Sequence, residues 1–165
     1  MKCCDVQRCG QCSGEALPLS CGELFERLLV LDYGRQPPWG PLHAVAVACF
    51  FLQHPRDGRT PVAGGDVQWA IVQRFLTGGM AAVNGLVAHA RSANSHRHPG
   101  RTGPMHLTGR QDPRLPQVPA PERFDTTIAD VAVDGSFPSA GYENRVRMWA
   151  HSTVTAWTAS ADPSQ

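Results

Sequence analysis

Lysine is nearly absent from this sequence, and neither sign of charge dominates it. Lys2 is the only lysine among 15 basic residues, which stand against 14 acidic ones for a net charge of +1. This balance excludes the strong positive field on which non-specific binding to nucleic acid or to an anionic membrane surface depends. We therefore expect neither nucleic acid nor a membrane as the partner of this protein.

Long hydrophobic runs, strand patterns and catalytic signatures are absent as well. The most apolar stretch, AVAVACFFL at residues 44–52, is too short to span a bilayer, and the first residues lack the hydrophobic core of a secretory signal. No segment alternates polar and apolar residues as a half-buried strand does. Walker A, Rossmann, G-x-S-x-G and H-E-x-x-H motifs do not occur. We expect a cytoplasmic protein of the all-α class.

Helical patterns account for most of the chain. Ser20 and Glu23 form a capping box ahead of a stripe of leucines that ends near Leu31. A second helix starting at Pro41 is apolar on nearly every side, which predicts that it runs through the centre of the fold. Further helices are predicted at residues 66–76, where Asp66 would be the cap, and at 80–91, 127–130 and 139–158. The result is a compact domain of five or six helices.

Four parts follow from the composition. Residues 1–19 form a cysteine-rich segment resembling a zinc knuckle, 20–92 the first part of the helical core, 93–121 a loop, and 122–165 the helices that complete the same core. Proline, glycine and arginine dominate residues 93–121, which predicts a mobile loop that buries little. His96, His98 and His106 lie in it, and ordering such a loop around a metal would cost chain entropy.

Cysteine is concentrated at the N-terminal end, where residues 3–12 hold four of the six. Cytoplasmic thiols stay reduced, which disfavours a disulfide framework. Cys9 and Cys12 have the spacing of two ligands of a tetrahedral zinc ion. A redox pair would need its first thiol at a helix N-terminus, yet no helix begins after Cys12. Zinc is therefore the favoured interpretation, and nothing assigns a role to Cys3 or Cys4.

Two further ligands follow from helix geometry. Cys21 opens the first helix, where the helix dipole favours a thiolate. A short, proline-rich turn predicts that the first two helices pack antiparallel, so His54 at the end of the second helix lies beside Cys21. His43 then lies about 16 Å from His54 along the axis, and we interpret it as a hydrogen-bonded core histidine. The predicted zinc ligands are Cys9, Cys12, Cys21 and His54, with His43 as the alternative fourth ligand.

These motifs resemble one known family. Cys9-x-x-Cys12, Cys21 at a helix start, LHAVAVACFFLQHP, TIADV and VRMWAHSTVTAW are similar to the DUF5946 family of uncharacterised bacterial proteins. The resemblance covers residues 9–55 and 126–158, and residues 93–121 look like an insertion of this chain. Gly22 stands where the family usually has Trp, and Ala46 where it has Asp. The resemblance implies no particular activity.

Three functions remain open at this point. The leading hypothesis is a small helical module with a structural zinc ion that binds a protein partner, because three thiolates and an imidazole leave no open metal position. One alternative is a metal-dependent hydrolase with an open metal position, lined by His43 or His151 and served by a carboxylate base. The candidate bases are Glu23, Glu26 and Asp32. Another alternative is a thiol redox sensor that uses Cys9 and Cys12.

Overall fold

The computed structural model describes residues 8–15, 18–59, 65–93 and 112–161. Its helices are α1 (Cys21–Tyr33), α2 (Trp39–Gln53), α3 (Gly65–Ala93), α4 (Ile128–Ala132) and α5 (Tyr142–Ser160). These ranges contain no strand, only an isolated bridge between Arg8 and Glu15. None of their helices is long and hydrophobic enough to cross a membrane. The predicted all-α class is confirmed, while Cys3, Cys4 and the three loop histidines lie outside the described residues.

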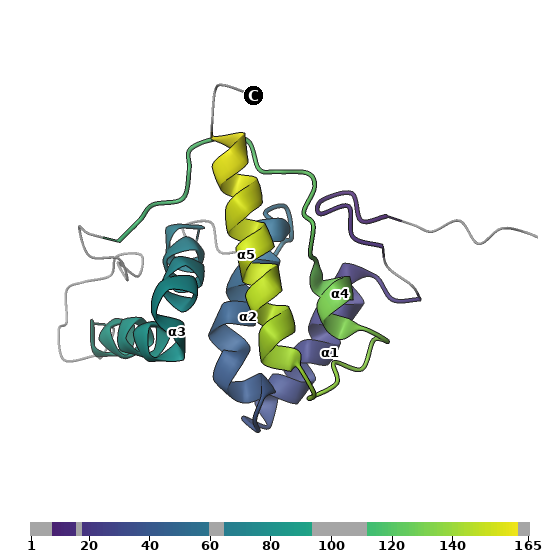
Figure 1. Cartoon of the computed structure of the whole chain (residues 1–165), viewed down its shortest axis with the longest axis horizontal. Coiled ribbons are helices and arrows are strands. Elements are labelled where there is room, and N and C mark those ends of the chain that lie inside the picture. The colour runs from purple at the N-terminus through teal and green to yellow at the C-terminus, as the bar shows by residue number, and fades with distance from the viewer. Residues whose placement is uncertain (1–7, 16–17, 60–64, 94–111, 162–165) are drawn as a thin grey trace, which may run out of the picture.

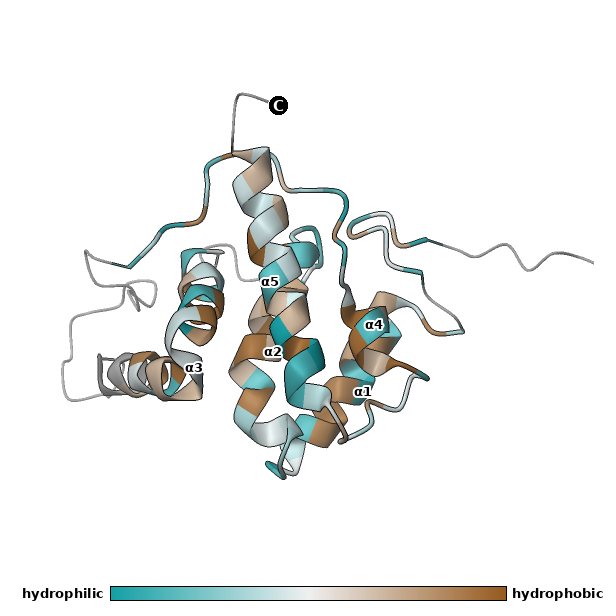
Figure 2. Cartoon of the chain, in the orientation of Figure 1, coloured by the Kyte–Doolittle hydropathy of each residue, from teal (hydrophilic) through white to brown (hydrophobic). Residues whose placement is uncertain are grey.

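Helix α2 is the centre of the fold. It contacts α1, α3 and α5, with α5 crossing in front of it in Figure 1, α3 on one side and α1 with α4 on the other. Val45, Ala46, Cys49 and Phe50 are fully buried along it. Hydrophobic segments colour α1, α2 and α4 brown in Figure 2. The central position predicted from the apolar sequence of this helix is what the structure shows.

Capping boxes begin α1 and α4 where the sequence predicts them. The Ser20 amide donates to the Glu23 carboxylate at 2.8 Å, and the Glu23 amide donates to the Ser20 hydroxyl at 3.3 Å. The Thr127 amide donates to Asp130 at 2.7 Å. These bonds satisfy amides that the first turn of a helix leaves without a partner.

The remaining starts differ from the predicted ones by a few residues. Helix α2 begins at Trp39, before Pro41, and α5 begins at Tyr142, after the predicted Ser139. Gly141, directly before α5, has a φ of 69°, and this left-handed conformation suits glycine.

Helix α3 has two halves that meet at Gly79, whose φ of 63° and ψ of −162° are not helical. This confirms the predicted break at Gly78 and Gly79, and Figure 1 shows the two halves running in different directions. The prediction that Asp66 caps this helix is wrong. Asp66 lies inside the first turn, and its carboxylate accepts a hydrogen bond from the Leu115 amide at 2.9 Å.

The hydrogen bond from the Leu115 amide to Asp66 also attaches part of the predicted loop to α3. Residues 112–121 have no regular structure, yet Leu115 and Val118 pack partly buried against the core. Arg74 on α3 also donates from Nε to the Asp112 carboxylate at 3.1 Å. Every residue of 112–121 is exposed or only half-buried, and a few isolated apolar residues of this extended segment nevertheless reach the core without any periodic pattern. Residues 94–111 lie outside the described residues.

One buried amide ties the last turn of α2 to the rest of the domain. Gln53 is fully buried, and its Nε2 donates to the Thr126 carbonyl at 2.9 Å and to the Thr153 hydroxyl on α5 at 3.0 Å. Gln53→Ala removes both bonds and leaves a cavity, so we expect the free energy of unfolding to fall by about 2–4 kcal/mol in urea denaturation. Gln117→Ala, on the exposed surface, should change it by less than about 0.5 kcal/mol. Equal losses in the two variants would contradict this account of the core.

Candidate metal centre

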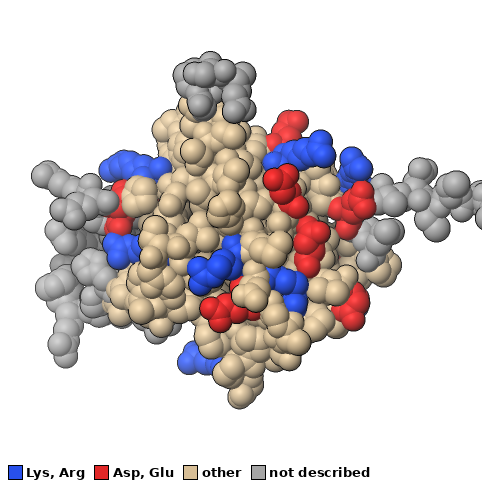
Figure 3. Space-filling view, in the orientation of Figure 1, with Lys and Arg blue, Asp and Glu red and all other residues tan. Residues whose placement is uncertain are grey.

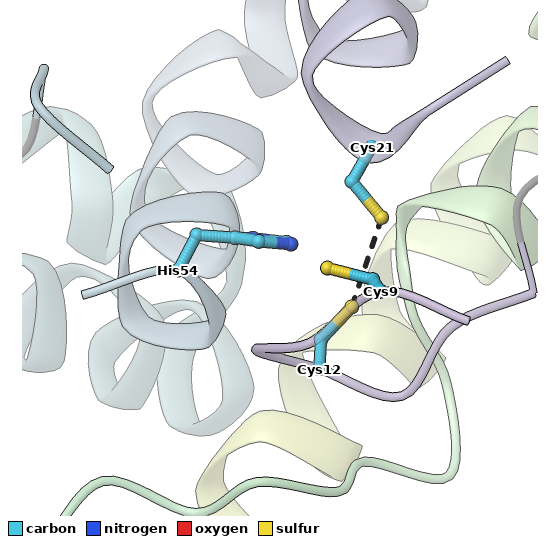
Figure 4. Close-up of side chains that lie close together, drawn as sticks. All are labelled: Cys9, Cys12, Cys21 and His54. Carbon is cyan, nitrogen blue, oxygen red and sulfur yellow. Dashed lines mark hydrogen bonds between the residues drawn. The ribbon is translucent and has the colours of Figure 1, made fainter. Parts of the chain in front are cut away.

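A tight turn over residues 9–14 positions the first two thiols. The Ser13 amide donates to the Cys9 carbonyl at 2.9 Å, and the Cys9 amide donates to the Gly14 carbonyl at 3.0 Å. Ser13 takes a φ of 57°, which reverses the chain. The Gly14 amide, in turn, points at Cys12 Sγ from 3.4 Å. The turn thus brings the Cys9 and Cys12 sulfur atoms to one side, as Figure 4 shows.

This turn is attached to the end of α2 and to the segment before α4. The Arg56 amide donates to Gln11 at 2.9 Å, and the Arg56 guanidinium donates to the Gly10 carbonyl at 3.0 Å. The Ser13 hydroxyl donates to the Glu122 carbonyl at 2.8 Å. The knuckle therefore has a fixed place on the domain.

The other two side chains come from helix ends. Cys21 is the first residue of α1 and His54 caps the C-terminus of α2, and both are buried. The three sulfur atoms and a ring nitrogen of His54 all lie within 4.8 Å of one another. Cys12 Sγ and Cys21 Sγ are 3.7 Å apart, close to the edge of about 3.8 Å expected for two sulfurs at 2.3 Å from one tetrahedral ion. This arrangement can hold a metal ion.

The orientation of His54 is set by its neighbours. Its Nδ1 lies 2.9 Å from the Phe50 carbonyl, which can only accept, so Nδ1 carries a hydrogen, and in the neutral ring the lone pair is on Nε2. The ring also stacks on Phe50 with 4.2 Å between centroids, and Phe50 stacks on Phe25 of α1 at 3.9 Å. Histidines that bind metals commonly donate their other nitrogen to a carbonyl in this way.

The electrostatics of the cluster favour a thiolate at Cys12. The hydrogen bond from Cys21 holds the pKa of the Cys12 thiol below its ordinary value, and His54 and the Gly14 amide contribute to this although burial opposes it. The pKa of Cys21 is raised, first by its bond to Cys12 and then by burial and the nearby thiolate. Two adjacent buried thiols repel each other once both ionise, and a bound cation would remove that penalty.

The four predicted ligands are therefore brought together, and His43 is not among them. His43 lies at the opposite end of the α1–α2 pair, where its Nδ1 is 2.7 Å from Asp32. Our interpretation of His43 as a core residue is wrong, because its side chain is half exposed, although the expected hydrogen bond exists. Cys49 is fully buried in α2, and burial raises its pKa. His151 is exposed on α5.

Sequence reasoning missed one residue of this site. A Cβ atom on Gly14 would lie 2.7 Å from Thr127 Oγ1 and 3.2 Å from Cys12 Sγ, so only glycine fits between the knuckle and the start of α4. The signal in the sequence is a glycine two positions after the second cysteine of the knuckle.

Two glycines of the knuckle give a matched test of this packing. Gly14→Ala should displace Cys12 or Thr127, because the new methyl group overlaps both, and should weaken metal binding by about tenfold or more. Gly10→Ala is the control, since a Cβ at Gly10 would have no atom within 4 Å. Competition titration with a chromophoric chelator measures both affinities. The steric account fails if the two variants bind metal equally well.

Comparison with known proteins places the chain in one family. No curated protein and no solved structure matches it. A family model, described as a family of unknown function, matches residues 7–158, which is nearly the whole chain and includes all four side chains of the cluster. The resemblance seen in the sequence is confirmed: the protein belongs to the DUF5946 family.

Proposed function

We propose that the protein is a small helical module built around a structural zinc ion, which Cys9, Cys12, Cys21 and His54 bind. The observation that carries this proposal is the convergence of these side chains to within 4.8 Å from a knuckle and two helix ends. Thiolate and imidazole ligands in tetrahedral geometry suit zinc better than calcium, magnesium or manganese. Three thiolates need a reducing compartment, which agrees with a cytoplasmic location.

The ligand set supports a structural role for the metal over a catalytic one. Four protein ligands complete a tetrahedron, so the ion keeps no position for an activated water molecule. The carboxylates considered for a hydrolase are engaged elsewhere: Glu23 in the helix cap, Glu26 with Arg59, and Asp32 with His43. None of these three carboxylates is therefore free to act as the base of a metal-dependent hydrolase at this cluster.

We further propose that the module binds a protein partner. Acidic and basic side chains alternate on the face shown in Figure 3, without a field of one sign. Such a mixed surface suits specific contacts with another protein better than contacts with a phosphate backbone.

The metal content of the purified protein tests the proposal directly. We expect about one zinc ion per chain by elemental analysis, because the cluster supplies one complete ligand set. Substituting serine for both Cys9 and Cys12 should abolish it, since half of the ligands are lost. Cys49→Ala is the matched control, because this thiol is buried in α2 away from the cluster. Stoichiometric zinc in the double variant would refute the site.

The two histidines of α2 test the geometry. His54→Ala should weaken zinc binding strongly and lower the thermal stability, because metal-binding energy is folding energy in such sites. His43→Ala should keep the zinc and cost about 1–3 kcal/mol, the effect of leaving Asp32 buried without its hydrogen bond. Cobalt substitution reports both, since tetrahedral thiolate coordination gives visible absorption bands. Loss of the bands in the His43 variant, with retention in the His54 variant, would overturn the assignment.

A further inference from the structure

An open cleft lies at the end of the α1–α2 pair that is remote from the metal cluster. Its volume is about 940 Å³, and its lining includes Asp32, Tyr33 and Arg35 from the end of α1, and Gly40 and His43 from the start of α2. None of these residues belongs to the metal cluster. The cleft is therefore chemically distinct from the metal cluster.

Asp32 and His43 form a dyad in this cleft. Asp32 Oδ2 and His43 Nδ1 are 2.7 Å apart, and the side chains are 2% and 50% exposed respectively. An ionised carboxylate only accepts hydrogen bonds, so Nδ1 of His43 is the donor. In the neutral ring this places the lone pair on Nε2. A buried carboxylate behind a half-exposed imidazole is the arrangement that holds a histidine ready to take a proton.

The Asp32–His43 pair contributes little to the stability of the folded protein, which favours a functional role for it. An ion pair with a half-exposed partner contributes little, whereas burying a carboxylate is costly. Asp32 Oδ1 is buried and accepts no hydrogen bond from any residue that the structure describes. Tyr142 of α5 has a buried hydroxyl in the same situation. Burial, and after it the charge of Asp32, raises the pKa of Tyr142, so this hydroxyl stays protonated near the carboxylate.

The other polar groups of the cleft indicate what it binds. Arg35 lines it and makes no ion pair with a described residue, so its guanidinium is available to an anionic group. The described lining holds no serine, threonine or cysteine that would serve as a nucleophile. The phenol of Tyr33, which is 91% exposed, is the one hydroxyl of the described lining, and we assign a water molecule as the species that His43 activates.

We propose that this cleft is a metal-independent hydrolytic site for small, negatively charged esters, with His43 as the general base, Asp32 as its positioning residue and Arg35 as the group that binds the substrate anion. The water oxygen bonds to the ester carbonyl carbon while its proton moves to His43 Nε2. The carbon–oxygen bond to the leaving group then breaks, the alcohol leaves as its anion, and the imidazolium returns its proton to the leaving group or to solvent. This activity is independent of the proposed role of the zinc ion.

The tautomer of His43 is the first test, and it needs no substrate. Long-range ¹H–¹⁵N spectra of the full-length, zinc-loaded protein, recorded where the ring is neutral, should show the hydrogen on Nδ1, the less common tautomer of a free histidine. Asp32→Asn should remove this preference, because the amide is a weaker acceptor and also offers a donor. A wild-type ring with its hydrogen on Nε2 would overturn the proposal, since the lone pair would then face Asp32 and not the cleft.

The second test measures turnover of 4-acetoxybenzenesulfonate, an anionic ester whose sulfonate cannot reach its own carbonyl carbon, by the zinc-loaded protein. His43→Gln should lower kcat/KM on the order of 100-fold, the lower end of the range for general-base catalysis. His151→Gln, which removes an exposed histidine of α5, should leave kcat/KM within about twofold, since solvent-exposed imidazoles add only background hydrolysis. Arg35→Gln should raise KM for this ester and leave the KM for neutral 4-nitrophenyl acetate unchanged. Circular dichroism establishes that each variant is folded.

The turnover of the wild type and the three variants distinguishes catalysis at this cleft from background hydrolysis. Turnover that disappears in His43→Gln and survives in His151→Gln supports the site. Equal turnover in the wild type and His43→Gln, or none above the buffer rate in the wild type, overturns it. An unchanged KM in Arg35→Gln would overturn the assignment of the anion-binding group. Zinc content, measured in parallel, shows whether the metal centre is intact in each sample.

Discussion

The antiparallel contact between α1 and α2 is the constraint on which the rest of the structure depends. Phe25 and Phe50 stack face to face at 3.9 Å between their centroids, and this pairing fixes the register of the two helices. Cys21 lies one turn before Phe25, and His54 one turn after Phe50, so both meet at one end. Eleven residues, close to three helical turns, separate Cys21 from Asp32 and also His43 from His54. The same register therefore creates the metal cluster and the Asp32–His43 dyad.

The sequence alone was sufficient for this hairpin and for the cluster, because both follow from strong local signals. Capping boxes locate the start of α1 and of α4, and a knuckle spacing with a short helical connection leaves few ways to close a four-ligand set. The features that could not be predicted from the sequence depend on tertiary contacts, and such contacts leave no periodic pattern in the sequence. The packing of Leu115 and the role of Asp66 as its acceptor belong to this class. So does the half-exposed position of His43, since α2 is apolar on nearly every side and we therefore expected its histidine to be buried.

The proposed metal ion would link three separate parts of the chain, which are the knuckle, the start of α1 and the end of α2. Residues 8–15 have no helix of their own, and their bonds to Arg56 and Glu122 are made near the surface. In the proposed zinc-loaded protein, one ion would tie this segment to the start of α1 and the end of α2. Zinc binding in such sites is worth about 10–16 kcal/mol, which is comparable to the whole stability of a small domain.

The stability that a zinc site would add bears on the opposite end of the hairpin, where Asp32 is buried. Burying a carboxylate such as Asp32 costs several kcal/mol, and one hydrogen bond to a half-exposed histidine does not offset that cost. A domain that tolerates such a group needs stability from elsewhere, and the proposed zinc site supplies it without altering the dyad, which lies about 16 Å away by helix rise. Rigid helices transmit the position of one end to the other, so the ion would also fix where α2 presents His43. The Phe25–Phe50 register thus links the cluster and the cleft. The proposed zinc site would stabilise the domain, and this stability would offset the cost of burying the carboxylate that orients His43.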